Sequence, residues 1–160
     1  MKADHFKALD ACHQQIHEHL AELAELLERL DVNSNTAHSR QKAKTIEAFF
    51  TETARTHHAE EERNVFPGIL LGGNAELVQA VQTLKQDHGW IEQNWIELAP
   101  MLRAIAQGED WVDMDELKHN AEVFLNLCHD HIVLEETLIY PEAKARLAEE
   151  LASRAKRLAQ

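Results

Sequence analysis

Apolar residues recur every three or four positions along most of the chain, with polar residues between them. In the first such stretch they are Ile16, Leu20, Leu23, Leu27 and Leu30, and in a later one Leu84, Ile91, Trp95, Leu98 and Leu102. This spacing puts them on one face of an α-helix. It predicts long helices over residues 4–30, 37–66, 75–106 and 114–140, and a shorter one near 142–158.

The breaks between these stretches are short. Residues 31–37 are polar and rich in helix-capping side chains, residues 66–74 hold a proline and three glycines, and residues 107–116 combine Gly108 with capping aspartates. The Tyr-Pro-Glu of 140–142 is expected to end the fourth long helix. Short connections between amphipathic helices predict an all-α fold: an antiparallel up-down-up-down four-helix bundle with a short C-terminal tail helix. We expect one such domain over residues 1–160.

Composition narrows the classes of function. The chain has only 5 glycines and 3 prolines, and its formal net charge is −12. That charge disfavours binding to nucleic acid or to an anionic membrane. No apolar run is long enough to cross a bilayer and no secretory leader follows Met1, so a cytoplasmic protein is expected. Cys12 and Cys128 are expected to be thiols rather than a disulfide.

The chain contains 11 histidines, and some of them belong to an internal repeat. The segment HQQIHEHLAEL from His13 aligns with HGWIEQNWIEL from His88, 75 residues later. The segment HHAEEERNVFP from His57 aligns with HIVLEETLIYP from His131, 74 residues later. Two segments that repeat at nearly one offset predict two helical hairpins related by a pseudo-twofold axis.

The repeat also indicates which histidines face the core. With a rise of about 1.5 Å per residue, these four histidines lie at a common depth in the bundle, one on each helix. His57 and Glu61 are four residues apart and so share a helix face, as do His131 and the glutamate at 135. This pattern predicts a layer of four imidazoles and two carboxylates in the core.

A rival pair, His58 and Glu62, lies on a neighbouring face of the same helix. The repeat places Ile132 opposite His58, and isoleucine cannot bind a metal. The sequence therefore favours the His57 frame and assigns His58 a flanking position.

Buried carboxylates and imidazoles without a cation would be costly, so the layer predicts a metal centre. Six donors are too many for one zinc ion, which normally takes four. They suit two iron or manganese ions bridged by the carboxylates, with a position left for an outside ligand. The predicted metal ligands are His13, His57, Glu61, His88, His131 and Glu135.

The motifs HxxxEExxVFP from His57 and HxxxEExxIYP from His131 resemble those of the hemerythrin-like family of cation-binding bundles, over residues 5 to 141. The resemblance implies a non-heme di-iron centre with oxo or hydroxo bridges, in which Glu61 and Glu135 bridge the metals. It also implies a small diatomic ligand, O2 or NO. Manganese or zinc in place of iron is the alternative.

The chain departs from the oxygen-carrying hemerythrins at two places. The position of their fifth histidine, one turn after His88, holds Glu92. Their aspartate lies five residues after the last histidine, whereas this chain has glutamates both four and five residues after His131, at 135 and 136. His17 matches Glu92 in the repeat, so both are candidates for extra ligands. Four histidines with two glutamates instead resemble the subfamily that repairs iron–sulfur centres after nitrosative stress.

Three functions remain open from the sequence. The first is a di-iron protein that binds O2 or NO for sensing, storage or detoxification. The second is iron-centre repair or the handling of peroxide or NO. The third is a structural bundle with a vestigial or zinc-loaded site. The sequence does not decide whether the protein is an enzyme, and it leaves the oligomeric state open.

Overall fold

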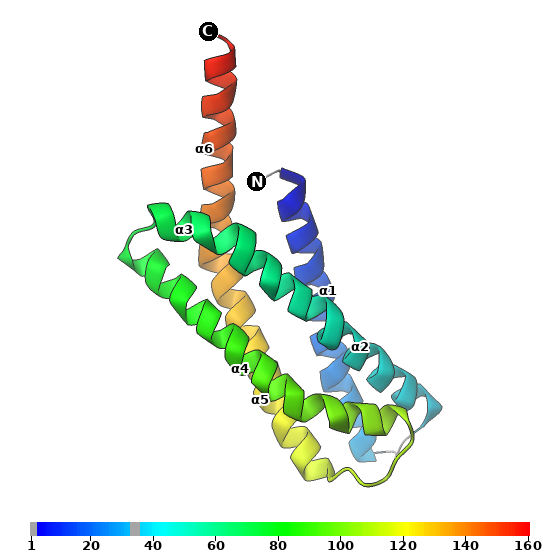
Figure 1. The fold of residues 1–160 in the computed structure, drawn as a ribbon. Coiled ribbons are helices and arrows are strands. Elements are labelled where there is room, and N and C mark those ends of the chain that lie inside the picture. Colours follow the sequence, from blue (N-terminus) through cyan, green and yellow to red (C-terminus); the bar gives the residue numbers. More distant parts are fainter. Residues whose placement is uncertain (1–2, 33–35) are drawn as a thin grey trace.

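The computed structural model describes residues 3–32 and 36–160, which are helical apart from short connections (Figure 1). Residues 33–35 of the loop expected at 31–37 lie outside the described residues. The helical elements are α1 (Ala3–Val32), α2 (Ala37–Glu60), η1 (Glu61–Val65), α3 (Phe66–Gly72), α4 (Ala75–Ala106), α5 (Met114–Leu134), η2 (Glu135–Ile139) and α6 (Tyr140–Leu158).

The helices α1, α2, α4 and α5 form the bundle, and successive ones run in opposite directions (Figure 1). Helix α1 packs against α2 and α5, and α4 packs against the same two helices. This arrangement confirms the all-α bundle expected from the sequence. Within the described ranges, no helix is both long enough and apolar enough to cross a membrane.

Polar side chains begin the helices as the sequence predicted. The side chains of Thr36 and Asn74 each accept a hydrogen bond from the amide three residues on, at 3.1 and 3.0 Å. Asp113 caps α5 in the same way. Gly108 has φ of +75°, a left-handed conformation that favours glycine after the end of α4. These local signals explain why the helix boundaries agree with the pattern.

The two prolines near the predicted breaks do not end their helices. At Glu61 and at Glu135 the backbone widens into one π-turn, and the helix then continues with Pro67 or Pro141 in its first turn. The amide of Phe66 bonds the Glu61 carbonyl, five residues back, and the same bond forms at 135. Proline has no amide hydrogen, and in the first turn of a helix that hydrogen would have no partner within the helix, so proline is tolerated there. The Tyr-Pro-Glu break is therefore wrong, and α6 continues directly from η2.

The apolar core consists of two clusters separated by a polar layer. One cluster includes Ile16, Phe50 and Ile91, and the other includes Leu9 and Leu84. Every apolar position singled out in the sequence is buried. Trp90 and Trp111 lie outside the core and are 58% and 61% exposed.

Candidate metal centre

A layer of seven buried histidines and glutamates separates the two apolar clusters of the core. They include all six ligands predicted from the sequence. The seven are His13, His57, His58, Glu61, His88, His131 and Glu135. The common depth inferred from the helix rise is therefore observed, and each helix of the bundle contributes to the layer.

The imidazoles of the layer point their Nε2 atoms at the carboxylates. The Nε2 atoms of His57 and His88 lie 3.2 and 3.5 Å from Oε1 of Glu61. The Nε2 atoms of His131 and His13 lie 2.9 and 3.6 Å from Oε1 of the glutamate at 135. These contacts join helices from both halves of the repeat. Nε2 of His13 also lies 3.9 Å from Oε2 of Glu61, so this imidazole faces both carboxylates.

The donor atoms divide into two groups that could each hold a metal ion. In one group are His58, Glu61, His88 and His131, and in the other His13, His57, Glu61 and Glu135. Glu61 belongs to both groups. Within the first, the Nε2 atoms of His88 and His131 are 3.0 Å apart, which is close to the separation of two adjacent ligands on one metal ion. A carboxylate common to both groups is what a bridged pair of ions requires.

The outward Nδ1 atoms of the histidines face a second set of carboxylates. The distances are 3.1 Å from His13 to Glu136, 3.7 Å from His88 to Glu62 and 3.7 Å from His131 to Asp87. Only the contact of His13 is a hydrogen bond, and Nδ1 of His88 and of His131 has no hydrogen-bond partner among the described residues. A carboxylate bonded to the outer nitrogen orients a metal-binding histidine and increases the basicity of the inner nitrogen. From the sequence, Glu62 was considered only as a rival metal ligand, and no role was predicted for Glu136 or Asp87. Two of them directly follow the ligand glutamates, so the paired Glu-Glu of each motif was the available signal.

His58 lies in the layer rather than beside it. Its side chain is only 7% exposed, its ring stacks on that of His88 at 4.0 Å, and its Nδ1 atom lacks a hydrogen-bond partner among the described residues. His57 instead lies against His13, with ring centroids 4.7 Å apart. Adjacent residues point about 100° apart on a helix, so these two histidines face the two halves of the centre. The repeat hid this arrangement because Ile132 occupies the matching position of α5.

Tyr140 is a further buried contact of the centre that the sequence analysis did not single out. Its hydroxyl donates a hydrogen bond to Oε2 of Glu61 at 2.9 Å, and its ring stacks on His13 at 4.6 Å. The equivalent position of the repeat is Phe66, whose ring faces His88. The replacement of phenylalanine by tyrosine was thus the only sign of a polar role here.

The two candidates for extra ligands, His17 and Glu92, lie outside both groups. Nε2 of His17 contacts Glu136 at 3.0 Å, so this histidine reaches the centre only through that carboxylate and His13. Glu92 is exposed on α4 and lines a pocket next to the centre. Neither residue completes the layer in this geometry.

Burial controls the protonation of the histidines. Desolvation lowers the pKa of His57 to about 4 although nearby Glu61 opposes the shift, and it lowers the pKa of His131 to about 2. It also lowers the pKa of His13, and that of His58 falls well below its ordinary value. These imidazoles are therefore neutral at pH 7, which is the form that binds metals.

The cysteines near the layer are free thiols, as expected. Burial raises the pKa of Cys12 to about 11, with a further rise from the charge of Glu61, and burial raises the pKa of Cys128 as well. Both are therefore protonated at neutral pH, which makes them poor nucleophiles.

The donor set fits a bound cation. Nε2 of His13, Oε1 of Glu61 and Oε2 of Glu135 are buried and have no hydrogen-bond partner within the described part of the chain. Unsatisfied polar atoms in a core are costly, and a cation between them would satisfy all three. Imidazole with carboxylate suits zinc, iron and manganese, so the donors alone do not choose among these metals.

Comparison with known proteins agrees with this geometry. The family described as the hemerythrin HHE cation binding domain matches residues 4–143. A relative in Haemophilus influenzae, named only as an uncharacterized protein, is 28% identical over 130 residues, which cover 81% of this chain and 73% of the relative. The family match over residues 4–143 contains every residue of the buried layer.

Proposed function

The chain belongs to the hemerythrin HHE cation-binding domain family, and on that premise we propose that it binds two iron ions and a small diatomic ligand, O2 or NO. Such a protein would serve in sensing, storage or detoxification. Manganese or zinc is the alternative metal content. The proposed ligands are the six residues predicted from the sequence, with His58 as an added donor.

The observation that carries this proposal is the position of Glu61. Its carboxylate is fully buried, belongs to both donor groups, and has an unsatisfied Oε1 atom within 3.5 Å of two imidazole nitrogens. Burial of an unpaired polar group costs about 2 to 7 kcal/mol, and burial of an unpaired charge such as a carboxylate costs more. Two cations on either side of it would remove that cost.

The surrounding residues would hold the centre in a fixed geometry. Glu136, bonded to the outer nitrogen of His13, keeps the Nε2 atom of that histidine directed inward, and Tyr140 holds Oε2 of Glu61 by a hydrogen bond. Apolar clusters flank the layer on both sides along the bundle. Iron, when bound, supplies redox chemistry and a coordination position for a small ligand.

The test is metal analysis combined with optical spectroscopy of protein from iron-supplemented growth. We expect two irons per chain and an absorption band that changes when air, dithionite, azide or NO is added. A protein that holds about one zinc and no chromophore would contradict the proposal and favour a structural bundle.

A second candidate function is redox turnover, such as the handling of peroxide or NO. The hydrogen bond from the Tyr140 phenol to the shared carboxylate favours it, because tyrosine can supply a proton and an electron next to the centre. Turnover of peroxide by the iron-loaded protein, with loss on Tyr140→Phe, would support this candidate over reversible binding.

A further inference from the structure

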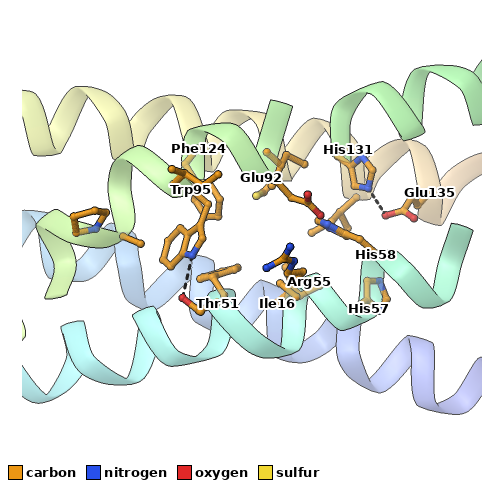
Figure 2. A pocket seen from close by; sticks show the side chains of 18 of the residues that line it. Ile16, Thr51, Arg55, His57, His58, Glu92, Trp95, Phe124, His131 and Glu135 are labelled. Carbon is orange, nitrogen blue, oxygen red and sulfur yellow. Dashed lines mark hydrogen bonds and ion pairs between the residues drawn. The ribbon is translucent and has the colours of Figure 1, made fainter. Parts of the chain in front are cut away.

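A pocket of about 370 Å³ extends from the surface of the bundle to the histidine layer. Figure 2 shows its two ends, with Trp95 and Phe124 at one and His58 and His131 at the other. Four of the seven layer residues line it, namely His57, His58, His131 and Glu135, whereas His13, Glu61 and His88 do not. The pocket therefore opens onto the proposed metal centre and extends beyond it between α2, α4 and α5.

The pocket is much larger than a diatomic ligand needs. A water molecule takes up roughly 30 Å³ of liquid, and O2 or NO is of similar size. Small-molecule sites in proteins commonly measure roughly 300 to 1,000 Å³. The volume therefore matches an organic molecule.

The walls of the pocket are mostly apolar. Phe50, Trp95 and Phe124 pack on one another with ring centroids 5.1 to 5.3 Å apart. The indole N–H of Trp95 donates to the hydroxyl of Thr51 at 3.2 Å, which fixes the ring. Ala99 also lines this part and leaves room that a larger side chain would fill. Such walls suit an aliphatic or aromatic body.

A proline inside α4 contributes to the shape of the pocket. Pro100 lines it together with Ile96, four residues earlier. Because proline has no amide hydrogen, the Ile96 carbonyl loses its usual helical donor, and a proline there bends the helix. Figure 1 shows α4 changing direction in its C-terminal part.

Charged side chains line the same pocket between its two ends. Arg103 is already paired with Glu47 at 2.7 Å. Arg55 is exposed, and among the described residues no carboxylate lies within ion-pairing distance of it. Figure 2 shows Arg55 and Glu92 in the middle of the pocket. The pocket therefore combines an apolar body with one unpaired guanidinium.

We propose that this pocket binds an amphiphilic organic monoanion, an apolar body carrying one carboxylate that pairs with Arg55. A guanidinium can donate two parallel hydrogen bonds to a carboxylate, so arginine selects this group over a hydroxyl or an amine. Glu92 lines the same pocket and repels a second negative charge. The apolar walls bury the body of the ligand and supply most of the affinity.

The experiment titrates the full-length protein, with and without iron, with decanoate by calorimetry. Fluorescence of Trp95 provides a second readout, and Trp95→Phe identifies its signal. Decanol and decylammonium are the matched ligands, since they keep the chain and change the head. We expect decanoate to bind at least tenfold more tightly than either, in both metal states.

Two variants and a control complete the test. Arg55→Gln is expected to weaken decanoate about tenfold, roughly 1.4 kcal/mol, and to leave decanol unchanged. Arg154→Gln removes an exposed charge far along α6 and is expected to change neither. Ala99→Phe is expected to abolish binding of both ligands.

Equal affinity for decanoate and decanol, or no effect of Arg55→Gln, would overturn the assignment of the anion. Binding that needs iron and ignores Arg55 would place the carboxylate on the metal instead and would also overturn it. The failure of both ligands to bind would reject the site. None of these results affects the metal content, so they are separate from the proposed di-iron function.

Discussion

Glu61→Gln is expected to change stability in opposite directions with and without metal. Glutamine has the shape of glutamate, and its carbonyl can still accept the hydrogen bond from Tyr140. Its amide can donate to Nε2 of His57, which lies 3.2 Å from Oε1. The substitution thus removes a buried charge and keeps the packing. Without metal the variant should be more stable than the parent. Addition of metal should stabilise the variant much less than it stabilises the parent.

The magnitudes follow from burial and linkage. Relief of a buried, partly unsatisfied carboxylate is worth about 1 to 3 kcal/mol. For a domain of this size each kcal/mol raises Tm by roughly 2–4 °C. Metal at 100 times its Kd stabilises the parent by about 2.7 kcal/mol. Glu61 belongs to both donor groups, so its loss should weaken both ions.

The assay is calorimetry of chelator-treated and metal-loaded protein, together with metal analysis. Glu60→Gln is the matched control, because this neighbouring glutamate belongs to neither donor group. It should leave metal content and both melting temperatures near those of the parent. Retention of both metal ions by Glu61→Gln, or a lower Tm without metal, would refute the reasoning.

Other consequences of the same geometry can be measured directly. His58→Ala should weaken the ion near His88 by more than tenfold in a competition titration, while His129→Ala should not; equal affinities would return His58 to a flanking position. Tyr140→Phe leaves Oε2 of Glu61 without its donor and should lower the unfolding free energy by about 1 to 3 kcal/mol in urea, with metal content kept. Without metal, stability should fall as pH drops from 6.5 towards 4, because over that window the unfolded chain protonates its histidines while His57 and His131 stay largely neutral in the folded protein; His57 alone should account for roughly 3 kcal/mol. A urea concentration of half-unfolding that stays constant across this pH range would contradict the pKa of about 4 for His57.

Much of the fold follows from local signals that sequence reasoning can use. The apolar period placed the helices, and caps such as Thr36 and Asp113 placed their ends. The π-turns at Glu61 and Glu135 could not be predicted this way. Each π-turn adds one residue to the helix shortly before a proline, and from the sequence the proline alone suggested a break. The helix can continue past the proline because the preceding turn is widened, and no single residue type specifies such a turn.

The candidate centre was predictable where the repeat holds and not where it breaks. The repeat brought out one histidine per helix and the two inner glutamates, and the structure brings all six together. For His58 the prediction was wrong, because the repeat aligns it with Ile132, which cannot bind a metal, and so placed it beside the layer. The repeat also gave no sign of Tyr140, whose partner is a phenylalanine. Both depend on contacts across the bundle, which the sequence of one helix does not contain.

The most direct test of the account is anomalous diffraction at the iron edge from crystals of protein produced in iron-rich medium. We expect two peaks about 3.5–4 Å apart, one on each side of the Glu61 carboxylate, with His88 and His131 at one and His13 and His57 at the other. A single peak, or none, with the histidine Nε2 atoms bonded only to protein or water, would contradict it.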